Sequence, residues 1–189
     1  SLSNCNNQDQ QLTALLDLFH KSLQLNNISE VTQILHLLAS YTFTTLQDKQ
    51  HVIDSVIIPH MSNFLSPEYF KQQDLLYISS QLCLMIDINS LALIEETDLI
   101  RKSFTLISAD SEFLKIIGLQ LASHLFSNCD LKIQTLNDNF IDFLTSLLND
   151  CSGFSLDFWL EYIKLIKSIF SKKLPLIFQK VRKVSSCKS

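Results

Sequence analysis

Apolar residues recur along most of the chain at intervals of three and four positions, the spacing that places side chains on one face of an α-helix. With Ser, Asn and Asp read as helix N-caps, this pattern predicts eight helices and a short terminal one. The first four are expected near 9–25, 28–44, 49–65 and 67–86, and the fifth is expected to end near Ser108. The next three are expected near 111–127, 131–149 and 156–171, and the short terminal helix is expected to start at Pro175. The sequence therefore predicts an all-α fold.

Side chains that can accept a hydrogen bond from a free backbone N–H mark several of these helix starts. Pro67 follows one of them and suits the first helical position, where its missing N–H costs nothing. Pro59 lies inside the third predicted helix, so we expect a kink or an early end there. The expected caps are, in chain order, Asn27 or Ser29, Ser66, Asp110 or Ser111, and Ser155.

One helix-opening phrase occurs three times. It reads SPEYF at 66–70, DSEFL at 110–114 and SLDFW at 155–159, at intervals of 44 and 45 residues. Each copy combines a capping residue, a carboxylate in the first turn and an aromatic residue. The phrase therefore predicts that Tyr69, Phe113 and Phe158 occupy equivalent positions, buried at successive seams between helices.

The helices that these phrases open are the more apolar ones, so we expect them to be covered on several sides by more polar helices. An inner and an outer helix alternating every 40–45 residues is typical of a two-helix solenoid. On the repeat length and the three phrases, residues 9–172 resemble the HEAT/armadillo superfamily. The resemblance implies a short right-handed α-solenoid of about four helix pairs. The alternative is an irregular bundle of eight or nine helices.

Composition supports long helices. The chain of 189 residues has two glycines and three prolines, where average usage would give about 13 and 9. We expect a disordered leader at 1–8, a single helical-repeat domain at 9–184 and a flexible tail at 185–189. The polar first residues do not form a signal peptide, and the apolar runs are too short to span a membrane.

The sequence offers little catalytic or ligand-binding chemistry. Gly118 and Gly153 are too far apart for a phosphate-binding loop, and no two histidines have metal-ligand spacing. The acidic pair Asp138 and Asp142, and the acidic group at 95–98, are typical of solvated helix faces and helix starts. The five cysteines form no CxxC pair and favour a reducing compartment. We expect no enzyme activity, no cofactor and no metal site.

Charge is distributed very unevenly. Through Glu161 the chain has 7 basic and 19 acidic residues, whereas after Glu161 it has 8 basic residues and no acidic ones. A basic end can contact phosphates or an acidic protein partner, or it can simply keep the tail soluble. The candidate contact residues are Lys164, Lys167, Lys172, Lys173, Lys180, Arg182 and Lys183.

These features favour a non-enzymatic scaffold domain that binds another protein through a peptide or helix docked on the solenoid groove or its terminal repeat. The polar leader favours the C-terminal part of a larger protein. We expect that protein to be intracellular, and nuclear rather than cytoplasmic. In general character the chain resembles helical-repeat domains of nuclear genome-maintenance scaffolds, which implies a role in DNA repair or meiotic recombination complexes. The alternative is a nucleic-acid-binding helical-repeat module that uses its basic C-terminal end.

Overall fold

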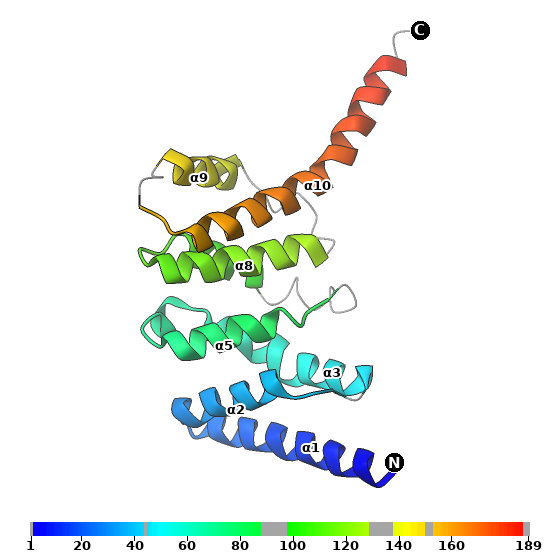
Figure 1. The fold of residues 1–189 in the computed structure, drawn as a ribbon, viewed down its shortest axis with the longest axis vertical. Coiled ribbons are helices and arrows are strands. Elements are labelled where there is room, and N and C mark those ends of the chain that lie inside the picture. The colour runs from blue at the N-terminus through cyan, green and yellow to red at the C-terminus, as the bar shows by residue number, and fades with distance from the viewer. Residues whose placement is uncertain (1, 44, 88–97, 129–137, 150–152, 187–189) are drawn as a thin grey trace. The chain divides into compact units, whose positions relative to one another are not determined.

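The computed structural model describes residues 2–43, 45–87, 98–128, 138–149 and 153–186, and side chains within 10–43, 45–87, 98–128, 143–148 and 153–171. Every regular element in these ranges is a helix, which confirms the predicted all-α class (Figure 1). The chain divides into two compact units, Ser1–Thr105 and Leu106–Ser189. The single repeat domain predicted for 9–184 stays a prediction.

The first unit begins with an antiparallel helical hairpin, formed by α1 (Leu2–Gln24) and α2 (Ile28–Ser40) (Figure 1). Helix α1 starts at Leu2, so it includes the residues assigned to a leader. The turn uses Asn26 at a φ of 52°, a left-handed conformation that Asn adopts more readily than most residues. Asn27 then caps α2, because its side-chain oxygen accepts from the Glu30 N–H at 3.3 Å. Of the two caps expected here, Asn27 is confirmed.

The third helical segment changes geometry around its proline. Helix α3 (Leu46–Val52) opens with a reciprocal capping box between Thr45 and Asp48. It continues as a π-helix, η1 (Ile53–Met61), and ends as the short α4 (Ser62–Phe64). Pro59 lies within the π-helical part. Since proline has no N–H to donate, a helix that continues through it must rearrange its hydrogen bonds locally, and here it widens instead of ending at Pro59.

The SPEYF phrase does not open an α-helix, contrary to the prediction. Pro67–Tyr69 form a single 3-10 turn, η2, and α5 begins later and spans Gln73–Cys83. Ser66 makes no capping hydrogen bond, because its hydroxyl instead accepts from the Lys102 ammonium. Tyr69 is half-buried, with its ring edge-on to Phe64 at a centroid distance of 5.5 Å.

Helices α2 and α5 lie side by side and run in the same direction (Figure 1). His36 on α2 contacts Asp74 at the start of α5, with 2.8 Å between Nε2 and Oδ1. The core of this unit consists of aliphatic and aromatic side chains from α1, α2, η1 and α5, and its fully buried members include Phe19, Leu35, Leu38, Ile57, Met61 and Leu76. Burial of these side chains, rather than helix propensity, stabilises the unit.

Helix α7 (Leu99–Ile107) leads into the second unit, which contains α8 (Glu112–Asn128), α9 (Asp138–Asn149) and α10 (Leu156–Ser186). Helices α8 and α10 pack together and run in the same direction (Figure 1). Their first turns are joined directly, since the Ser155 N–H donates to the Glu112 carboxylate at 2.7 Å. Ser155 also caps α10 as predicted, because its Oγ accepts from the Phe158 N–H at 3.3 Å.

Two of the three repeated phrases are thus adjacent in space, DSEFL and SLDFW. Phe158 is fully buried, whereas Phe113 and Tyr69 are half-buried. The prediction that all three aromatic residues are buried is therefore confirmed for Phe158 alone. For Tyr69 the reason is local, because it ends a 3-10 turn and not the first turn of an α-helix.

The separate terminal helix predicted from Pro175 is wrong. Helix α10 is continuous for 31 residues and passes through Pro175. A proline inside a helix removes one backbone hydrogen bond and strains the preceding turn. The Lys- and Leu-rich sequence on both sides has favourable helix propensity, which is consistent with the helix continuing.

Two adjacent buried serines on α5 give a test of this packing. Ser80 donates to the Tyr77 carbonyl at 2.7 Å, whereas the buried Ser79 hydroxyl has no hydrogen-bond partner among the described residues. We expect Ser79→Ala to raise the free energy of unfolding by about 0.5–1 kcal/mol, since it removes a desolvated, unpaired hydroxyl and improves helix propensity. Ser80→Ala is the matched control and is expected to be neutral or destabilising. Urea titrations in which Ser79→Ala destabilises the chain more than Ser80→Ala would contradict this packing.

Candidate functional site

One face of α10 belongs to the core of the second unit. Its buried side chains are Phe158, Tyr162, Leu165 and Ile169. The Phe158 ring stacks on Phe154 at 4.1 Å between centroids, and the Tyr162 hydroxyl donates to the Leu144 carbonyl of α9 at 2.9 Å. Burial raises the pKa of Tyr162 above its usual value. This face fixes the rotation of α10 about its own axis.

The opposite face of α10 is apolar and exposed. We define the α10 stripe as Leu156, Leu160, Ile163, Lys167 and Phe170. The exposed fractions of its apolar members are 73%, 48%, 60% and 54%, in chain order. Successive members are four and three positions apart, which places them along one line of a helix. A row of large apolar side chains left in water is the usual mark of an interaction surface.

This stripe was not predicted from the sequence, although a signal for it is present there. The same spacing of four and three continues in the sequence after Phe170 with further apolar residues, namely Leu174, Ile177, Val181 and Val184. Such a pattern over four heptads is typical of a helix that packs against another helix along its length. Because the buried face of α10 has the same spacing, the sequence alone did not separate the two faces.

A hollow of about 360 Å³ flanks the α10 stripe on its α8 side. We call it the serine–lysine hollow, and it is lined by Ser123, Ser127, Lys164, Lys167, Ser168 and Ser171. Ser168 donates to the Lys164 carbonyl at 2.8 Å, and its Oγ lies 2.7 Å from Ser127 Oγ and 3.2 Å from Ser123 Oγ. The hollow is therefore polar and basic, and it borders an apolar surface.

The structure places two of the seven predicted contact residues in this region. Lys164 and Lys167 are both exposed and both line the hollow. Lys164 forms an ion pair with Glu161 at 2.8 Å, whereas Lys167 has no ion-pair partner among the described side chains. The other five side chains lie outside those described: Lys172, Lys173, Lys180, Arg182 and Lys183.

The first unit also contains a hollow, of about 410 Å³, between the starts of α2 and α5. Hydroxyl and amide side chains line most of it, including Thr32, Gln33 and Gln73, together with Asp74. The Thr32 hydroxyl donates to the Ile28 carbonyl of its own helix. This hollow has no basic side chain among its lining residues, so it is the weaker candidate.

The fold brings together two histidines that the sequence spacing kept apart. His20 of α1 and His60 of η1 have ring centroids 5.9 Å apart, and Phe19 packs against both rings. Burial, with a smaller contribution from the charge of His20, lowers the pKa of His60. His20 Nδ1 is 2.7 Å from the Leu16 carbonyl. In the described part of the chain, no three metal-ligating side chains gather at one point.

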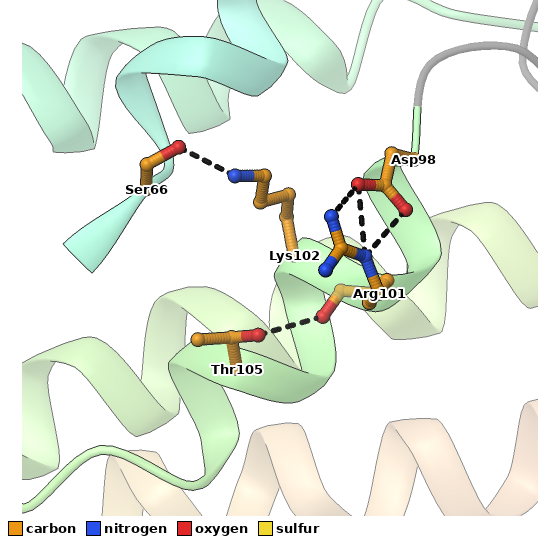
Figure 2. A network of polar contacts seen from close by, with 5 residues as sticks. All are labelled: Ser66, Asp98, Arg101, Lys102 and Thr105. Atoms are coloured by element: carbon orange, nitrogen blue, oxygen red, sulfur yellow. Dashed lines mark hydrogen bonds and ion pairs between the residues drawn. The ribbon is translucent and has the colours of Figure 1, made fainter.

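Two further residues have structural roles. Cys83 is fully buried, and burial raises the pKa of its thiol to about 12, which disfavours the reactive thiolate. Asp98, at a φ of 60°, forms an ion pair with Arg101 in the first turn of α7 (Figure 2). In the same figure Lys102 reaches back to Ser66. Asp138, Asp142, Glu95 and Glu96 lie outside the described side chains.

None of the helices in the described ranges has the length and apolar character that a bilayer crossing requires. Comparison of the chain with family models, with curated proteins and with solved structures finds no match in any of the three. A proposal for the function therefore depends on the residues and their geometry.

The ion pair in Figure 2 predicts an acid-dependent loss of stability. Hydrogen bonds and charge from Arg101 lower the pKa of Asp98. The Asp98 carboxylate therefore binds a proton less readily in the folded state than in the unfolded state. The contribution of the ion pair to the free energy of unfolding is present above about pH 4 and is lost as the pH falls through the folded-state pKa of Asp98. Because the pair is exposed to solvent, we expect only about 0.2–0.5 kcal/mol.

A double-mutant cycle with Asp98→Asn and Arg101→Gln measures this contribution. Asn tolerates the left-handed backbone at this position, so the substitution changes charge with little added strain. The coupling energy from urea titrations should be present at about pH 6 and should decrease as the pH is lowered from about 4 towards 2. A coupling energy that stays constant over this range would contradict the assignment.

Proposed function

We propose that this chain is a non-enzymatic protein-interaction domain that docks its partner on the exposed face of α10. The observation that supports this most directly is the α10 stripe. Its four large apolar side chains lie along one line of the helix, and each is about half exposed or more. Leaving such a row in water has an unfavourable free energy that a partner would relieve. The basic residues beside it would provide the polar rim that interaction surfaces have.

The solenoid arrangement belongs to the same proposal. Parallel packing of α2 with α5, and of α8 with α10, is what stacked two-helix repeats would produce within each unit. Ser123 and Ser168, 45 positions apart, are neighbours on α8 and α10, which matches the predicted repeat length.

Nucleic-acid binding is the second candidate. The serine–lysine hollow favours it, because ammonium and hydroxyl groups are common contacts to phosphate. A surface that contacts only phosphates does not require exposed apolar side chains, so nucleic-acid binding would leave the α10 stripe unexplained. Protein binding is therefore the preferred function, and nucleic-acid binding is the alternative that a binding experiment can test.

Site-specific crosslinking tests the proposal. A photo-crosslinking residue placed at Leu160 or Ile163 of the full chain should give discrete protein adducts in a nuclear extract. The same residue at Leu37 of α2, which is 53% exposed, is the matched control and should give none of these adducts. We expect the further substitution Phe170→Asp to reduce adduct yield at Leu160 by about tenfold or more, since a charge at an apolar contact position of an interface is strongly unfavourable.

Circular dichroism of each variant establishes that the helices are intact. Equal adduct yields at Leu160, Ile163 and Leu37 would contradict the proposal, because they would show that α10 captures proteins no better than any other exposed leucine.

A further inference from the structure

We infer that the partner segment docked on α10 is an acidic amphipathic helix. The inference rests on the proposed function and adds the chemistry of the partner. The helix would lay its apolar side chains along the α10 stripe and direct carboxylates towards Lys164 and Lys167. One of these carboxylates would enter the serine–lysine hollow.

The spacing of the stripe selects a helix over an extended strand. From Leu156 to Phe170 the stripe is about 21 Å long, at 1.5 Å per residue. Its members alternate at four and three positions, which is the arrangement that receives the side chains of a second helix along a shared seam. A strand presents its side chains with a period of two and about 3.3 Å per residue, so its apolar residues would fall out of step with the stripe.

The charges beside the stripe select an acidic helix. Lys167 is a member of the stripe itself, and no described acidic side chain pairs with it. Docking a helix here would remove water from the Lys167 ammonium, which is costly unless the partner supplies an opposite charge. Lys164 lies at the edge of the stripe, where its ion pair with Glu161 leaves 61% of the lysine side chain exposed. From Lys164 to the end of α10 at Ser186 the sequence has basic residues and no acidic one.

The serine–lysine hollow provides a place for one carboxylate next to Lys167. Ser127 and Ser171 are exposed at the hollow, and Ser168 is nearly buried behind them. Ser171 donates to the Ser168 carbonyl at 3.0 Å, and Ser127 lies 2.7 Å from Ser168 Oγ. Because hydroxyl groups rotate freely, exposed serines can turn to donate to a carboxylate that approaches Lys167.

A second copy of this chain packed in parallel is a poorer occupant. In a parallel pairing of two α10 stripes, Lys167 of one copy would face Lys167 of the other. Two ammonium groups in a desolvated seam repel each other, and such residues lower the stability of the pairing. An acidic helix from another protein meets no such repulsion.

Two designed, fluorescein-labelled peptides of about three heptads provide the probes. Both carry Leu at the a and d positions, and they differ only in having Glu or Lys at every e and g position. Binding to the full chain is measured by fluorescence anisotropy at low salt. We expect the Glu peptide to bind about tenfold or more tightly than the Lys peptide, and this preference to shrink as salt screens the charges.

Substitutions of charged and of apolar residues test separately how each kind of residue contributes to peptide binding. The double variant Lys164→Glu, Lys167→Glu should reverse the preference between the peptides, whereas Lys71→Glu, an exposed lysine of the first unit, should leave it unchanged. Ile163→Asp should abolish binding of the Glu peptide. Each variant is checked by circular dichroism, so that loss of binding is not confused with loss of folding.

Four outcomes would overturn the inference. Equal binding of the two peptides would show docking without charge selection, and this result would leave the proposed function intact. Tighter binding of a DNA duplex than of the Glu peptide, lost in the double lysine variant, would instead support the nucleic-acid alternative. A dimer in sedimentation that dissociates in Ile163→Asp would make a second copy the occupant. Binding of neither peptide, with crosslinks still formed at Leu160, would show that the partner is not an acidic helix.

Discussion

Helix α10 has apolar side chains on two opposite faces, but its packing against α8 can bury only one of them. The buried face is anchored by Phe158, fully enclosed at the start of the helix, and by the Tyr162 hydroxyl bound to the Leu144 carbonyl. The bond from the Ser155 N–H to Glu112 aligns the first turns of α8 and α10. With rotation and register fixed in this way, Leu160 and Ile163 must face water. The candidate surface is therefore a consequence of how the core is packed.

Local chemistry explains which parts of the fold were predictable from the sequence. Asn27 and Ser155 cap their helices as expected, because an N-cap interacts with backbone only two or three residues away. Ser66 has the same local signal, yet its hydroxyl is bound by Lys102, 36 positions further on. The residues of the SPEYF phrase alone do not reveal that Lys102 binds the Ser66 hydroxyl. A kink or an early end was expected at Pro59, whereas the helix widens there, an outcome that helix propensity does not decide.

The basic residues of the candidate site could be predicted from the sequence, whereas its exposed apolar residues could not. Lys164 and Lys167 were identified from the uneven charge distribution, which composition alone reveals. The α10 stripe was not identified, because Phe158, Tyr162, Leu165 and Ile169 have the same spacing as the exposed residues. Only the position of α8 separates a core face from a free one. Two lysines show the same contrast, since Lys102 binds Ser66 within the fold, whereas Lys167 has no ion-pair partner among the side chains that the structure describes.

The aromatic cluster at the start of α10 has a consequence for spectroscopy. Trp159 is the single tryptophan of the chain, and its ring lies 5.2 Å from Phe158 and 5.6 Å from Tyr162 between centroids. All three residues belong to the second compact unit. Intrinsic tryptophan emission therefore reports on the environment of this unit alone. If the two units melt separately, a fluorescence trace would record one transition where calorimetry would record two.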